Sequence, residues 1–166
     1  FQPICTTPTG TIVITAPIGS DLVYSINGGT TYQAGTTFAA LAPNATYSLT
    51  VRNTITGCIS AASQVIILPI PANPIAPTGT ITQPTCNAPT GAISITAPIG
   101  ANLEYSINGG TTYQSTTSFG SLAAGTTYAV TVRNTVNGCI SAAGSFVIIP
   151  APTFPATPVA NGSDVC

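Results

Sequence analysis

Short runs in which apolar and polar residues alternate are the dominant pattern of this chain. Residues 11–15 read TIVIT and residues 22–26 read LVYSI, so that Ile12, Ile14 and Tyr24 share buried faces if each run is extended. Alternation with a period of two is typical of a strand with one buried face. Turn residues rich in Gly, Pro and Asn separate the runs, and no helical periodicity is present. The pattern predicts an all-β protein.

The whole pattern occurs twice, with a period of 81 residues. Residues 5–66 (the first copy) and residues 86–147 (the second copy) are identical at 39 of 62 positions. A repeat of this length is the size of a small β-sandwich that can close its own core. We therefore expect two tandem domains rather than one.

Differences between the copies predict which side chains face solvent. Val13 is replaced by Ser94, while the flanking Ile12 and Ile14 are retained, so Val13 should point outward. Val23 is replaced by Glu104, and an unpaired Glu is costly to bury. We expect the face that carries Glu104 to be solvent-exposed.

Two turns have recognisable chemistry. Residues 27–29, Asn-Gly-Gly, supply the positive φ values of a tight hairpin, and residues 31–33 should form the short returning strand. Tyr47 follows a turn in the manner of the tyrosine corner of immunoglobulin-like sandwiches. Beyond it, Leu49 and Val51 should point inward, and Thr50 and Arg52 outward.

These elements predict two tandem immunoglobulin-like or fibronectin-III-like β-sandwiches of about seven strands each, joined by a Pro-rich linker. The expected boundaries are residues 1–70 for the first repeat, 71–79 for the linker and 80–150 for the second repeat. Residues 151–166 should be a further Pro-rich linker and the start of a third repeat. The chain is thus expected to be a window of a longer protein or a processed product.

Charge is unusually scarce, with two Lys+Arg, three Asp+Glu and no His in 166 residues. Without a basic patch, nucleic-acid binding is not expected. No apolar run is long enough for a membrane span. Low charge weakens repulsion between copies and favours self-association. General acid–base catalysis has no evident participants, so we expect no enzymatic activity and no cofactor.

Five cysteines without metal-ligand spacing indicate disulfides and an oxidising, extracellular location. Two pairings satisfy the repeat. In the first, Cys5 bonds Cys58 and Cys86 bonds Cys139, while Cys166 belongs to a further copy. In the second, Cys58 bonds Cys86 and Cys139 bonds Cys166, so that successive domains are linked and Cys5 would pair with a cysteine that precedes it. The first is favoured, because each bond would close a loop of over 50 residues, worth about 4 kcal/mol in the chain-entropy model.

Four side chains are candidates for surface contacts. Arg52 and Arg133 could bind a carboxylate or a glycan, or could simply lie along a neighbouring side chain. Tyr32 and Tyr113 could stack on sugars, or could pack on the strand face. The second interpretation is favoured in both cases.

The motifs from Gly10 to Ile14, from Tyr24 to Gly29 and from Tyr47 to Val51, together with Gly57-Cys58, resemble SprB-type repeats. Those are immunoglobulin-like modules in large surface adhesins of Bacteroidetes that the type IX system secretes. The resemblance covers both copies. It implies a disulfide within each domain, a filamentous cell-surface role and no catalytic residues.

The favoured function is therefore a structural or adhesive part of an extracellular filament or stalk. Its partners would be copies of itself, along a covalent array or a polymer. Two alternatives stay open: a module that binds glycans or abiotic surfaces, and a short subunit of a non-covalent, pilus-like polymer.

Overall fold

The computed structural model describes residues 1–160, which form two compact units. Unit 1 contains Phe1–Asn73 together with Asn134–Cys139, and unit 2 contains Pro74–Arg133 and the chain from Ile140 onward. The turn at 134–139 thus belongs to the second copy in sequence but groups with the first copy in space. The boundary at residues 73 and 74 falls inside the stretch expected to be a linker.

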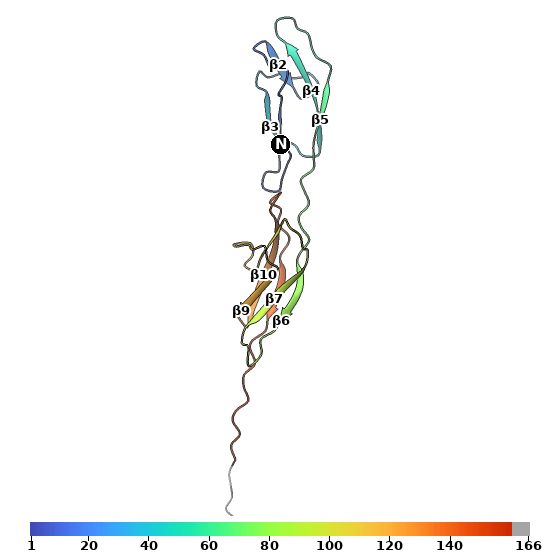
Figure 1. The fold of residues 1–166 in the computed structure, drawn as a ribbon. Coiled ribbons are helices and arrows are strands. Elements are labelled where there is room, and N and C mark those ends of the chain that lie inside the picture. The colour runs from blue at the N-terminus through green and yellow to red at the C-terminus, as the bar shows by residue number, and fades with distance from the viewer. Residues whose placement is uncertain (161–166) are drawn as a thin grey trace, which may run out of the picture. The chain divides into compact units, whose positions relative to one another are not determined.

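The first copy folds into two antiparallel sheets. Strands β1 and β3 form one sheet, and β2, β4 and β5 form the other in the order β2-β4-β5 (Figure 1). The strand bounds are Gly10–Val13 for β1, Leu22–Ser25 for β2, Thr37–Leu41 for β3, Ala45–Asn53 for β4 and Ser63–Ile67 for β5.

The second copy repeats this topology and includes one more strand, whose matching positions in the first copy would come almost entirely before Phe1. Its sheets have the orders β6-β7-β9 and β11-β10-β8. The additional strand, β6, pairs antiparallel with β7. The bounds are Thr78–Thr82 for β6, Gly91–Ala97 for β7, Leu103–Ser106 for β8, Ser118–Leu122 for β9, Thr126–Asn134 for β10 and Gly144–Ile148 for β11.

The prediction of all-β sandwich domains is confirmed, whereas the expected seven strands per copy is wrong. The described residues form five strands in the first copy and six in the second. Residues 31–33 make only one bridge, between Tyr24 and Gln33, and the segment after Cys58 makes one bridge, between Arg52 and Ile59. Each of these segments meets its neighbour at a single residue pair, too little to form a strand. In addition, β6 begins at Thr78, inside the predicted linker.

Both sheets of each copy contribute to its core, as the alternation predicts. Ile12 and Ile14 are buried and Val13 is 45% exposed, so the predicted facing is confirmed. The same holds for Ile93 and Ile95 in the second copy. The buried core of the second copy comprises Ile93, Ile95, Tyr105, Leu122, Val130, Val132, Phe146 and Ile148.

The tyrosine corner is present in both copies. The backbone N–H of Ala42 donates a hydrogen bond to Tyr47 Oη at 2.9 Å, and that of Ala123 donates to Tyr128 Oη at 2.9 Å. The contact ties the turn before the long strand to the strand's own start. The sequence prediction is confirmed here because the donor and the acceptor lie only five residues apart.

The Asn-Gly-Gly segment is not a tight hairpin. The pairing residues are Tyr24 and Gln33, with a wide loop between them. Gly28 and Gly29 have φ values of 70° and 92°, and Ser25 Oγ accepts a hydrogen bond from the N–H of Gly29 at 3.0 Å. The side chain at Ser25 therefore closes the loop, a role that a turn propensity cannot indicate.

Candidate functional site

Among residues 1–160, one disulfide bonds a cysteine of the first copy to a cysteine of the second copy, and both cysteines lie in unit 1. Cys5 is bonded to Cys139, 134 positions away, and their Cα atoms lie 5.0 Å apart. Both predicted pairings are therefore wrong for Cys5 and Cys139. Cys58 and Cys86 are free thiols, and Cys166 lies outside the described residues. We call Cys5 and Cys86 the leading cysteines of their copies, and Cys58 and Cys139 the trailing cysteines.

The error has a physical cause. A repeat predicts that a leading cysteine bonds a trailing cysteine, because that relation preserves the period. It does not indicate whether the two partners come from the same copy or from successive copies. In the observed disulfide the partners come from successive copies. The leading cysteine of the first copy bonds the trailing cysteine of the second.

The bonded cysteines lie in a fitted site. Cys139 is fully buried, and the carbonyl oxygen of Pro71 lies 3.5 Å from Cys5 Sγ and 3.6 Å from Cys139 Sγ. The N–H of Cys5 donates a hydrogen bond to the carbonyl of Asn137 at 3.0 Å. A Cβ atom on Gly138 would lie 2.7 Å from Thr6 Cγ2, so the two turns touch closely.

The turn that carries Cys139 owes its shape to residues within the turn itself. Asn134 Oδ1 accepts hydrogen bonds from the N–H groups of Val136 and Asn137, and Gly138 takes a φ of 70°. An Asn that bonds the backbone two or three residues ahead is a common turn former, and Gly accommodates positive φ without strain. These contacts hold Cys139 at the end of a rigid turn.

The predicted surface arginines lie over tyrosine rings. Arg133 Cζ is 4.1 Å from the centroid of the Tyr113 ring, and Arg52 Cζ is 4.4 Å from that of Tyr32. Each arginine thus lies along a neighbouring side chain, as the favoured interpretation expects. Because the guanidinium covers one ring face, that face is closed to a sugar.

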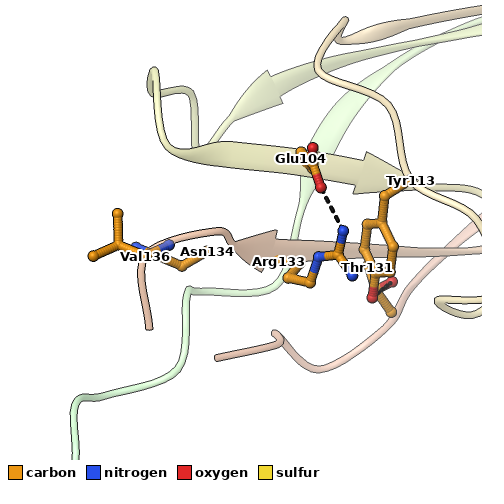
Figure 2. A network of polar contacts seen from close by, with 6 residues as sticks. All are labelled: Glu104, Tyr113, Thr131, Arg133, Asn134 and Val136. Atoms are coloured by element: carbon orange, nitrogen blue, oxygen red, sulfur yellow. Dashed lines mark hydrogen bonds and ion pairs between the residues drawn. The ribbon is translucent and has the colours of Figure 1, made fainter. Parts of the chain in front are cut away.

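The second copy adds a carboxylate to this stack. Arg133 Nη2 forms an ion pair with Glu104 Oε2 at 2.6 Å, and Figure 2 shows Arg133 between Glu104 and Tyr113. The side chain of Glu104 is 30% exposed, so the expectation that its face is solvent-exposed is only partly correct. Arg133 supplies the partner that permits this partial burial. In the first copy, Val23 takes the place of Glu104 and offers no carboxylate.

The loop tyrosines also cover threonines that we expected to face outward. Thr50 and Thr131 are 5% and 6% exposed. Tyr32 Oη lies 3.4 Å from Thr50 Oγ1, and Tyr113 Oη lies 3.5 Å from Thr131 Oγ1. The wide loop folds back over the sheet, so the outward face of this strand is covered rather than open.

The first copy contains a groove that sequence reasoning did not predict. Its volume is about 310 Å³, and its lining includes Val13, Ile14, Leu49, Val51 and Ser60. At the matching place in the second copy, Gly79 and Thr80 of β6 pair with Ile95 and Ser94. The groove is thus the place that β6 fills in the second copy.

The described residues include two free thiols, but they do not include a cluster of possible metal ligands. Residues 1–160 contain no group of three or more His, Cys, Asp or Glu side chains that could hold a metal ion. The same residues include no helix that is long and apolar enough to cross a membrane.

Comparison with solved structures finds distant likenesses. No protein-family model matches the chain, and no curated protein matches it in sequence. Domains 7, 8 and 9 of the S-layer protein SbsC align with 94% of this chain at 9% identity and a TM-score of 0.35. The FN1–FN3 domains of chicken CNTN1 align with 87% of it at 12% identity and a TM-score of 0.32. The chain spans 61% and 55% of those two structures.

Proposed function

We propose that this chain is a non-enzymatic structural or adhesive module of an extracellular filament or stalk, related to the SprB-type repeats that it resembles. The observation that carries the proposal is the bond between Cys5 and Cys139, which joins one copy to the next. A ligand-binding module needs each domain to keep its own fold. A load-bearing array also needs its successive domains to be joined.

Two further features support this function. A disulfide of this kind persists in oxidising compartments outside the cytosol, which agrees with a cell-surface location. Charged residues make up only 3% of the chain, so copies of this module repel one another little. Both features suit a protein whose main partners are further copies of itself.

The glycan-binding alternative is weaker. Its candidate residues, Tyr32 and Tyr113, each have a guanidinium over the ring at 4.4 and 4.1 Å. A stacking sugar would have to displace that arginine or use the opposite face. A glycan array that bound the chain specifically, with binding lost in Tyr113→Ala, would reverse this preference.

Electron microscopy of native material tests the proposal. We expect long, thin fibres with a regular axial repeat, and globular particles alone would contradict it. A reducing, denaturing gel then separates the two forms of the proposal. A chain of far higher mass than the 16.5 kDa of these residues indicates a covalent array, and a chain near that mass indicates separate subunits.

A further inference from the structure

We propose that Cys86 of one chain and Cys58 of a second copy of this chain form the same disulfide that Cys5 and Cys139 form here, and that this bond links chains head to tail. The inference rests on the proposed function, because both thiols stay reduced in a chain that never reaches an oxidising compartment. The inferred partner of each free thiol is the other thiol in a second copy of the same chain.

The repeat makes the two free thiols the unmatched halves of the observed bond. Cys86 is the leading cysteine of the second copy and matches Cys5, and Cys58 is the trailing cysteine of the first copy and matches Cys139. In the disulfide between Cys5 and Cys139, a leading cysteine bonds the trailing cysteine of the next copy. The same rule pairs Cys86 with the trailing cysteine of whatever copy comes next.

The segment around Cys86 already has the conformation that the segment around Cys5 has in the observed disulfide. Around Cys5, Ile4 and Thr7 exchange backbone hydrogen bonds of 3.0 and 3.1 Å. Around Cys86, Thr85 and Ala88 exchange the matching bonds at 2.8 and 3.2 Å. The carbonyl oxygen of Pro152 lies 3.6 Å from Cys86 Sγ, as that of Pro71 lies beside Cys5 Sγ.

The turn that carries Cys58, the trailing cysteine of the first copy, is also preformed, and its thiol is free. Asn53 Oδ1 accepts hydrogen bonds from the N–H groups of Ile55 and Thr56, as Asn134 does in the closed site. A Cβ atom on Gly57 would meet no atom within 4 Å, whereas one on Gly138 would meet Thr6 at 2.7 Å. Cys58 is exposed, whereas Cys139 is fully buried.

The matched geometry predicts the contacts of the new junction. The N–H of Cys86 would donate to the carbonyl of Thr56 in the partner chain, and Asn87 would lie against Gly57, as Thr6 lies against Gly138. Because the two surfaces differ, the contact is heterologous. Such contacts produce open filaments when the rotation between copies does not close a ring.

The bond requires an oxidant. Two thiols lose two protons and two electrons as the sulfur–sulfur bond forms. A disulfide of another molecule, such as oxidised glutathione, accepts them and leaves as two thiols. The reaction passes through a mixed disulfide on either cysteine.

The test uses the 166-residue chain with Cys166→Ser, so that the cysteine outside the described residues cannot contribute. Treatment with oxidised glutathione should give a non-reducing ladder at multiples of the chain mass, which a reductant collapses to one band. Oxidation that consumes both thiols but leaves monomers would mean an intrachain Cys58–Cys86 bond or two glutathione mixed disulfides, which the mass of the chain distinguishes, and either product would overturn the proposal.

Two single variants in the same background make the test specific. Neither Cys58→Ser nor Cys86→Ser should form the ladder alone, but an equimolar mixture should give a heterodimer and nothing longer. With one variant labelled with ¹⁵N, trypsin releases residues 53–133 from each chain, and the linked pair must contain one light and one heavy peptide. Light–light and heavy–heavy pairs in equal amount would show random oxidation and reject the junction.

A variant that keeps both thiols tests the docking of the turns. Gly57→Asn retains positive φ, which Asn tolerates, but fills the space that the partner's Asn87 would occupy. We expect ladder formation to slow by about tenfold or more, whereas an unchanged rate would exclude a fitted junction. If native fibres exist but survive reductant and show no such bond, this inference fails while the proposed function stands.

Discussion

The two copies share most of their sequence, yet among residues 1–160 only the second has a strand that precedes its leading cysteine and covers its core; the positions that match β6 in the first copy would come almost entirely before Phe1. Val130 and Val132 are fully buried, while their counterparts Leu49 and Val51 are partly exposed beside the groove. The difference follows from β6, which covers the edge of β7. The complete structural repeat therefore begins at the strand before the leading cysteine, and the stretch from cysteine to cysteine is only part of it.

The cysteines show the same contrast. Cys139 is buried and bonded, whereas Cys58 is in a turn of the same shape but is exposed and free. Closely similar local sequence thus gives two different chemical states, and the neighbouring segment decides between them. The following predictions test how far each difference between the copies matters.

The largest expected effect is loss of the closed disulfide. Cys139→Ser opens a loop that spans 134 positions, and the chain-entropy model gives a loss of about 5 kcal/mol in the free energy of unfolding. The matched variant Cys58→Ser should change stability by less than about 0.5 kcal/mol, because it alters an exposed, free side chain. Guanidinium unfolding of both under non-reducing conditions checks the comparison. Equal midpoints would show that the bond does not stabilise the fold.

The next effect concerns the strand that distinguishes the copies. A Cβ atom at Gly79 would collide with the carbonyl oxygen of Ser94 and lie 3.1 Å from the Cα of Ile95. We expect Gly79→Val to detach β6 at a cost of about 3 kcal/mol. Hydrogen exchange should then accelerate in β7. Gly120→Val is the control, because a Cβ atom there meets no atom within 4 Å. Unchanged protection of β7 would show that β6 does not close this core.

The same substitution at matching positions of the two copies measures how much the covering of the core by β6 adds to the free energy of unfolding. Val132→Ala should lower the free energy of unfolding of the second copy by about 2.5 kcal/mol, since the side chain is fully buried. Val51→Ala removes the same atoms from a partly exposed site and should cost about 1 kcal/mol. Hydrogen exchange resolved by copy separates the two values. Equal costs would mean that the groove is closed in solution.

The smallest effect is electrostatic. Glu104 and Arg133 are 30% and 40% exposed, so their coupling in a double-mutant cycle should be only about 0.5 kcal/mol. Salt at about 1 M should remove most of it. Val23→Glu should create a coupling of similar size with Arg52 in the first copy. A coupling that resists salt would instead indicate a desolvated pair.

Local chemistry made much of the fold predictable. The facing of Ile12, Val13 and Ile14 follows from alternation within five residues, and the corner at Tyr47 follows from a turn next to its own strand. Features that join distant segments were not predictable in this way. The period of 81 residues permits Cys5 to bond either trailing cysteine, and only the packing of the turn at Asn134–Cys139 within unit 1 selects Cys139.

Two other errors have the same origin. The prolines before Thr78 indicate a linker, yet the pairing of Gly79 with Ile95 extends the sheet into that stretch. The burial of Thr131 depends on Tyr113, eighteen residues away, which folds over it from a loop. Pattern alone assigns the direction of a side chain but not what covers it.

The bond between Cys5 and Cys139 also sets how the chain would respond to a pull on its ends. Tension that enters at Cys5 crosses the sulfur–sulfur bond to Cys139, so the residues between them carry none of it. That span of 134 positions corresponds to about 450 Å of extended backbone, a length that the chain cannot gain while the bond is intact. While the bond is intact, the span between the two cysteines cannot be pulled out by such a force. Once the bond is reduced, the force acts on that span, so the redox state of one bond sets how far the chain can extend.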